Sequence, residues 1–288
     1  MNTYKWLVRR EIWENRAIWT LPLAIGAVLL LAALFGRVEF DVPFLAVQTH
    51  SAGALLLFAF GAVFFFVMSI YSAWYLLDSL YADRKDRSIL FWKSLPVSDA
   101  ETVIAKLATG LLVIPVVYFV VADSTTLIIA FIVSLRARTW LGASLWNPEI
   151  WLQLQVLWIY LILTIAIWFL PVAAWLLLVS AWAKRSVTLW SIMPPLALVW
   201  AEKMFFGTHL IGEALSDRLM TGYPATAFHD FTGSLAAAAQ GTAAAPLDVW
   251  KLLAPVDFVA SPSTWIGVAV GVALVAAAIK LRARSVEL

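Results

Sequence analysis

The chain has 288 residues, of which 63% are hydrophobic and only 13% are charged, and its formal net charge is +2. Together with a mean hydropathy of +0.88, this composition excludes an ordinary soluble domain and indicates a membrane protein that crosses the bilayer several times. Cysteine is absent, which excludes a disulfide framework and a thiolate metal site.

The first 16 residues predict a helix at the headgroup level. On a helix Lys5, Arg9 and Arg16 share one stripe, with Trp6 and Trp13 beside it, a pattern typical of a membrane-surface segment. No convincing small-residue cleavage site follows. We therefore expect the next apolar run to be a retained span and not a removed signal peptide.

Six apolar stretches follow one another along the chain, and about 20 residues are enough to cross a bilayer as a helix. The third is long enough to imply tilt, a kink at Pro115 or extension into water, and Pro171 lies inside the fourth. The fold class predicted is an all-α polytopic membrane protein, with residues 1–288 as a single transmembrane domain. The predicted spans cover about residues 17–35, 52–77, 103–135, 151–182, 187–206 and 265–279, and residues 207–264 form a long extracytoplasmic segment.

The distribution of basic residues predicts which side the termini occupy. An even number of spans places both termini on one side, and the basic residues on that side are Lys5, Arg9, Arg10, Arg16, Arg84, Lys85, Arg87, Lys93, Lys106, Lys184, Arg185, Lys280, Arg282 and Arg284. Those on the other side are Arg37, Arg136, Arg138, Lys203, Arg218 and Lys251. Because cytoplasmic loops carry the excess of Lys and Arg, the pattern predicts cytoplasmic termini.

The cytoplasmic region 78–102, between spans two and three, carries the densest charge in the chain. Its centre, Arg87 to Leu95, predicts a short helix that ends at Pro96. Ser98 with Glu101 three residues later predicts a capping box that opens the next helix. Such a short helix suits a soluble partner, because aromatic and arginine side chains anchor interfaces. The alternative is a loop that its basic side chains hold on the anionic inner leaflet.

The sequence lacks the common motifs of catalytic, phosphate-binding and metal-binding sites. It contains no phosphate-binding loop, no nucleophile elbow and no metal-ligand spacing among its three histidines. We therefore predict that this chain is not an enzyme, holds no metal or cofactor of its own and does not bind nucleic acid.

Three segments resemble the permease subunits of type-2 ATP-binding cassette (ABC) exporters. They are DRKDRSILFWKSLPVSD at residues 83–99, WFLPVAAWLLLVSAWAKR at 168–185 followed by Pro194-Pro195, and SPSTW at 261–265 before a small-residue last span. The resemblance covers essentially the whole chain, and the first segment is its most specific part.

The resemblance implies an exporter permease of the bacterial inner membrane. Two copies of the chain would form the pathway as a homodimer, and two separate ABC-type ATPase subunits would bind ATP and Mg²⁺ and drive transport. Arg87 to Leu95 would be the coupling helix that docks the ATPase, and Lys184 and Arg185 would form a second cytoplasmic contact. The docking residues implied are Arg84, Lys85, Arg87, Phe91, Trp92, Lys93 and Leu95.

Inside the spans, Asp123, Trp168 and Trp175 are the candidates for a substrate pathway. A charge at the bilayer centre costs roughly 2.5–3.5 kcal/mol on insertion scales, so Asp123 should face protein or water. It lies either on the substrate route or in a hydrogen bond that ties two helices together. The two tryptophans share a helix face that would either line a path or pack.

Gly267 and Gly271 predict close helix packing in the last span, more within the chain than between copies. Two other function classes stay open: a secondary transporter that uses Asp123 as its intramembrane carboxylate, and a membrane interaction protein that transports nothing.

Overall fold

The computed structural model describes residues 3–36, 51–86, 97–137, 145–230, 233 and 248–284. In chain order its helices are α1 (Thr3–Glu14), α2 (Ala17–Phe35), α3 (Ser51–Lys85), α5 (Asp99–Ala108), the π-helix η2 (Thr109–Val113), α6 (Ile114–Ala137), α8 (Pro148–Trp168), α9 (Leu170–Trp182), α10 (Val187–Phe206), α11 (Leu210–Ser216), the π-helix η3 (Asp217–Thr221), α12 (Gly222–Ala227), α14 (Val249–Leu252), α15 (Pro255–Ala260) and α16 (Pro262–Arg284).

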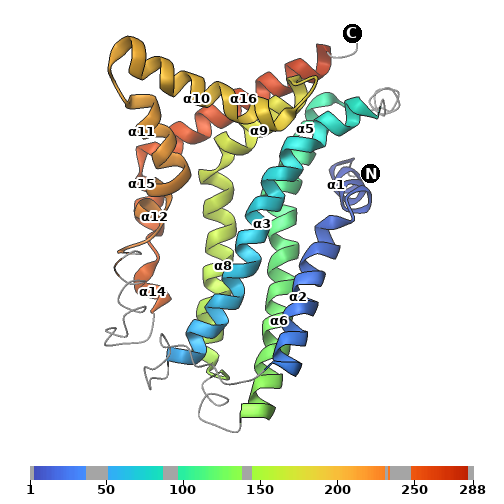
Figure 1. The fold of residues 1–288 in the computed structure, drawn as a ribbon, viewed down its shortest axis with the longest axis vertical. Coiled ribbons are helices and arrows are strands. Elements are labelled where there is room, and N and C mark those ends of the chain that lie inside the picture. Colours follow the sequence, from blue (N-terminus) through green and yellow to red (C-terminus); the bar gives the residue numbers. More distant parts are fainter. Residues whose placement is uncertain are drawn as a thin grey trace.

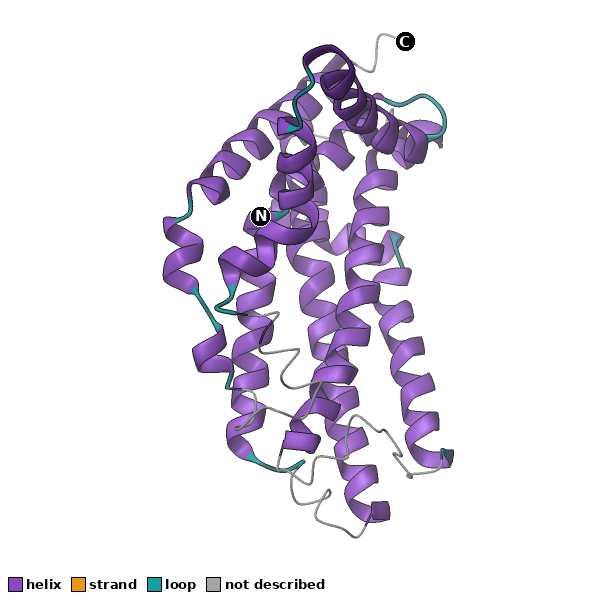
Figure 2. Cartoon of the chain, turned by 60° about the vertical axis from the view of Figure 1, so that its left-hand side comes forward, coloured by secondary structure: helices purple, strands orange, loops and turns teal. Residues whose placement is uncertain are grey.

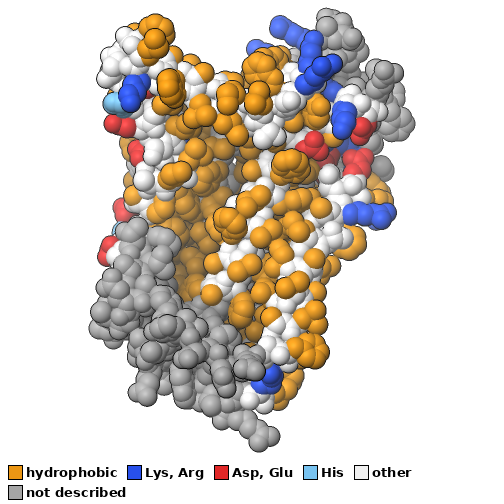
Figure 3. All heavy atoms as spheres, in the orientation of Figure 1, with side chains coloured by type: hydrophobic (Ala, Val, Ile, Leu, Met, Phe, Trp, Pro, Cys, Tyr) orange, Lys and Arg blue, Asp and Glu red, His pale blue; other side chains and the backbone are white. Residues whose placement is uncertain are grey.

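Four long helices, α2, α3, α6 and α8, run along the long axis of the molecule (Figures 1 and 2). Five helical stretches of the described chain are long and apolar enough to cross a membrane: Ala17–Phe35, Leu57–Lys85, Asp99–Arg136, Pro148–Trp168 and Pro262–Arg284. Below the charged side chains near the upper end, the described surface in view is broadly apolar (Figure 3). The chain is therefore an all-α membrane protein, as its composition predicts.

The main core lies where α2, α3, α6, α9 and α16 meet. Its fully buried side chains include Ile18 from α2, Phe64 from α3, Tyr118 from α6, Leu177 from α9 and Ala278 from α16. Many large apolar side chains of the same helices point outward instead. That outward apolar surface is the composition that lipid contact favours, since hydrocarbon costs such side chains nothing.

Two of the long predicted spans contain a proline, and each departs from regular α-helix close to it. Pro115 has no N–H to give. The π-helix η2 ends two residues before it and connects α5 to α6 without a loop. Pro171 follows the break between α8 and α9, where Phe169 leaves helical geometry. The third predicted span is the continuous run of α5, η2 and α6, in which a kink at Pro115 stays a prediction, and the fourth predicted span is the pair α8 and α9.

The fifth predicted span forms helix α10, but α10 is not among the stretches apolar enough to cross a membrane. Pro194, Pro195, Glu202 and Lys203 lower its hydropathy. Figure 1 shows it lying across the upper end of the bundle instead of along it. The chain then descends through α11, η3, α12 and α14, and α15 and α16 return it to the upper end, where α1 also lies. The count of six spans remains a prediction.

Candidate functional site

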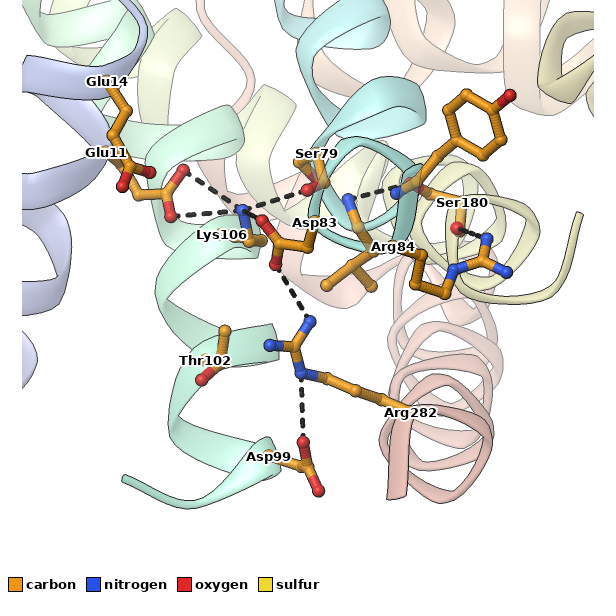
Figure 4. Close-up of polar contacts among 12 residues, drawn as sticks. Glu11, Glu14, Ser79, Asp83, Arg84, Asp99, Thr102, Lys106, Ser180 and Arg282 are labelled. Atoms are coloured by element: carbon orange, nitrogen blue, oxygen red, sulfur yellow. Dashed lines mark hydrogen bonds and ion pairs between the residues drawn. The ribbon is translucent and has the colours of Figure 1, made fainter. Parts of the chain in front are cut away.

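A network of buried charges joins four helices at the upper end of the bundle (Figure 4). It contains Glu11 of α1, Asp83 of α3, Lys106 of α5 and Arg282 of α16, and each of these residues is less than a tenth exposed. We call these four residues, with Asp99 at the start of α5, the charge network. Two of its carboxylates lie next to the predicted coupling helix, because Asp83 is near the end of α3 and Asp99 begins α5.

Lys106 is the centre of the charge network. Its Nζ lies 3.2 Å from Glu11 Oε1 and 3.4 Å from Asp83 Oδ1, and it donates a hydrogen bond of 3.0 Å to the carbonyl oxygen of Ser79. A buried ammonium group is stable only when it is paired and its protons are hydrogen-bonded. Lys106 meets that condition through α1 and α3 together.

Arg282 connects the last helix to both sides of the predicted coupling segment. Its Nη1 lies 3.0 Å from Asp83 Oδ2 at the end of α3, and its Nε lies 3.1 Å from Asp99 Oδ1 at the start of α5. One guanidinium group therefore bridges the two helices that flank residues 87–96. The planar fork of arginine suits this task, because its donors are fixed relative to one another.

Glu11 ties the N-terminal helix into the same network. The phenol of Tyr75 donates to Glu11 Oε2 at 2.7 Å, and Arg10 Nη2 lies 2.6 Å from Oε1. Burial by itself raises the pKa of Glu11, but the charges of Lys106 and Arg10 and the hydrogen bond from Tyr75 more than offset burial. The pKa of Glu11 is therefore below its ordinary value, and the side chain is ionised at neutral pH.

Arg84, a predicted docking residue, is directed toward α9. Its Nη2 donates to the carbonyl oxygens of Ser180 and Ala183 at the end of that helix, a favourable place for a cation. The hydroxyl of Ser180 in turn accepts bonds from the backbone N–H groups of Leu80 and Tyr81. The end of α3 is thus fixed to the turn that follows α9.

The described part of the first predicted contact, Arg84 and Lys85, lies close to the second predicted contact. Lys184 and Arg185 are exposed in the turn after Ala183, the residue whose carbonyl Arg84 binds, and Lys85 is exposed at the end of α3. The remaining predicted docking residues, Arg87, Phe91, Trp92, Lys93 and Leu95, lie outside the described residues. The capping box of Ser98 and Glu101 is confirmed at the start of α5.

Asp123 is hydrogen-bonded between two spans. Its Oδ1 accepts a bond from the amide of Gln155, so the pair joins α6 to α8. Of the two interpretations of Asp123, this contact favours the one in which it ties helices together.

Replacing Asp123 by asparagine is expected to leave the free energy of unfolding within about 0.5 kcal/mol of the wild type, because the amide oxygen still accepts from Gln155. Replacing it by leucine is expected to cost about 1–3 kcal/mol, since the Gln155 amide then lacks its acceptor. Unfolding in mixed micelles measures both. An asparagine variant that folds normally but loses transport would favour the pathway interpretation instead.

Trp168 and Trp175 pack within the chain. Trp168 is buried against Tyr223 and Phe258, and its indole N–H donates to the carbonyl of Arg218. Trp175 donates to the carbonyl of Ser191, which joins α9 to α10. Both contacts support the packing interpretation of these two rings.

The predicted close packing at Gly267 and Gly271 also occurs within the chain. A Cβ on Gly271 would lie 2.7 Å from Leu170 Cγ, so the absence of a side chain lets α16 approach the start of α9. A Cβ on Gly267 would meet the guanidinium of Arg218.

The sequence predicts that Lys106 and Arg282 lie on one side of the membrane, but it does not pair them with Glu11 or Asp83. A signal was present: Asp83, Lys106 and Arg282 each lie at the end of an apolar run, where a charge facing inward needs a partner. Among the described residues, no group of three or more His, Asp or Glu side chains could hold a metal ion. The contacts of the charge network connect α1, α3, α5 and α16 to one another.

Neither a protein-family model, nor a curated protein, nor a solved structure matches the chain.

Proposed function

We propose that this chain is the membrane-spanning permease subunit of an ATP-driven ABC exporter in the bacterial inner membrane. It works as a homodimer with two ATPase subunits, which hydrolyse ATP with Mg²⁺, and both termini are cytoplasmic. The support from the sequence is the resemblance at residues 83–99 and 168–185. The support from the structure is the charge network.

The observation that carries the proposal is the bridge formed by Arg282. A coupling element must pass motion from a soluble partner to the spans, and this requires firm attachment of the helices on both sides of it. Asp83 and Asp99 flank the predicted coupling helix, and both bind the same guanidinium group of the last helix. A push on residues 87–95 is thereby passed to α3, α5 and α16 together, and through Lys106 to α1.

The secondary transporter has less support. It requires a carboxylate that takes up and releases an ion during transport, and Asp123 is the candidate. Its bond to Gln155 gives that carboxylate a structural role. The exporter remains the better explanation of a charged, helix-flanked cytoplasmic segment.

The test of the proposal is purification of the tagged chain from its native membranes in a mild detergent. We expect a second subunit that contains a phosphate-binding loop to copurify in equal amount, with Mg²⁺-dependent, vanadate-sensitive ATP hydrolysis. Reconstitution in vesicles should couple this hydrolysis to export. A chain that purifies alone even after chemical cross-linking, with no such hydrolysis, would refute the proposal.

The proposed orientation predicts a labelling pattern. The chain has no cysteine, so Lys184→Cys and Lys251→Cys each introduce a single thiol at an exposed position. We expect a membrane-impermeant maleimide to label Lys251→Cys from outside intact cells, and Lys184→Cys only after permeabilisation. The reverse pattern would invert the topology.

A further inference from the structure

A cleft of about 460 Å³ lies beside the charge network. It is bounded on one side by the junction of α1 and α2, at Glu14 to Ala17, and on the other by the part of α3 near its C-terminal end. Its walls combine three aromatic rings, Tyr71, Trp74 and Tyr75, with carboxylates from both sides. A space of this size accommodates a small polar group together with part of an apolar chain.

The residues that α3 gives to the cleft change in character along the helix. Tyr71, Tyr75, Asp78 and Ala82 recur every three or four residues and so share one face, which Asp86 continues in the turn directly after the helix. At 1.5 Å per residue this face extends over about 22 Å. Aromatic rings line the part nearer the middle of the bundle, and carboxylates line the part near its charged end.

Counted over the described residues alone, the charge at that end is negative and largely uncompensated. Neither Asp78 nor Asp86 forms an ion pair with any described residue. Glu14, on the opposite wall, lies 3.4 Å from Arg10, and its side chain is 44% exposed. Lys106 also borders the cleft, but Glu11 and Asp83 already neutralise it. The described carboxylates of this end therefore favour a cationic group over an anionic one.

We propose that this cleft binds an ammonium group carried on an apolar chain. Asp78 and Asp86 attract the ammonium group, and the faces of Trp74 and Tyr71 favour a cation through their ring quadrupoles. Trp74 is 60% exposed on the apolar surface, where it would contact the chain of the ligand. Both amine-headed phospholipids and single-chain cationic amphiphiles have this chemistry. The proposal requires neither an ATPase partner nor transport.

Native mass spectrometry of the full chain in nonionic micelles tests the proposal and separates the two sources. One arm compares lysophosphatidylethanolamine with lysophosphatidylglycerol of the same acyl length. The other compares dodecylamine with dodecanol. We expect one amine-bearing ligand per chain, retained in preference to its matched control. Retention in the first arm alone identifies a membrane lipid as the source, and retention in the second alone identifies a cationic amphiphile.

The variant Asp78→Asn with Asp86→Asn should bind the amine about tenfold more weakly, since partly exposed ion pairs are individually weak. Both positions are exposed, and neither forms an ion pair with a described residue, so folding should be unchanged. The matched control, Glu213→Gln with Asp230→Asn, removes the same charge from exposed sites elsewhere and should bind normally. Trp74→Leu gives a second test, with weaker amine binding and unchanged folding.

Two results would overturn the proposal. One is equal retention of the amines and their uncharged or anionic counterparts. The other is wild-type affinity for the amine in both the asparagine variant and Trp74→Leu.

Discussion

Replacing Lys106 by methionine is expected to lower the free energy of unfolding by about 3 kcal/mol or more. The side chain is 2% exposed, and its removal leaves the carboxylates of Glu11 and Asp83 without the cation between them. Breaking a buried pair by removing one partner typically costs about 3–5 kcal/mol, because the other charge stays buried. Arg10 and Arg282 remain near the two carboxylates, so we place the loss at the lower end.

Reversible unfolding in mixed detergent micelles measures this loss. Lys280→Met is the matched control: Lys280 is exposed on α16, and its replacement should change stability by less than about 0.5 kcal/mol. Adding Glu11→Gln to Lys106→Met should recover part of the loss, because the neutral amide no longer needs a cation. Equal stability of Lys106→Met and Lys280→Met would show that the charge network does not hold the helices together.

The wild type and Lys106→Met should also differ in how their stability responds to acid. The pKa of Glu11 is below the ordinary value of 4.5 in the folded chain, despite burial, because Lys106, Arg10 and Tyr75 favour the ionised form. A carboxyl group with a lowered pKa stabilises the fold above its unfolded pKa, and this contribution is lost as the pH falls through the folded pKa. Without Lys106 the folded pKa of Glu11 rises toward its unfolded value, so Lys106→Met should lose less of its stability than the wild type as the pH falls through this range.

Much of the fold follows from hydropathy. The first four predicted spans and the last correspond to helices, and the capping box of Ser98 and Glu101 marks the start of α5 to the residue. These features depend on neighbours in the sequence, which a single sequence contains in full.

The orientation of α10 could not be predicted from hydropathy in the same way. An apolar run of twenty residues predicts a span, yet Pro194-Pro195 and the pair Glu202 and Lys203 make it less apolar than the others. Glu202 is buried because it accepts bonds from Thr208 and from the backbone N–H of Ile211, which form the turn into α11. Such a tertiary role for a charged side chain has no local signature.

The charge network has the same limitation. Asp83 and Arg282 are 199 residues apart in the sequence, and their pairing depends on how α3 and α16 pack. The sequence indicates that each needs a partner but not which one. The positions of charges at span ends could therefore be predicted, and their connections could not.

Replacing both Phe91 and Trp92 by alanine is expected to weaken binding of the proposed ATPase subunit about thirtyfold. Both residues belong to the predicted coupling helix between a charged run and Pro96. Removing an aromatic anchor from an interface typically costs about 2 kcal/mol or more, which corresponds to roughly a thirtyfold loss of affinity. The spans and the charge network do not include these residues, so insertion and folding should be normal.

Quantitative copurification, with ATP hydrolysis and export measured on the same preparation, tests this expectation. The matched control is Phe205→Ala with Phe206→Ala, which removes two exposed aromatic rings at the far end of α10 and should leave the ATPase bound. Arg87→Glu should weaken the same contact in a manner that depends on salt, because exposed charges are screened.

The variant also separates the coupling role from membrane anchoring. A segment that only rests on the inner leaflet would lose membrane affinity with its aromatic rings, while the ATPase stayed bound and active. If the double alanine variant copurifies with its ATPase at the wild-type ratio and exports normally, residues 87–95 do not couple the two subunits. The bridge that Arg282 forms between Asp83 and Asp99 would then serve only to hold the helix ends together.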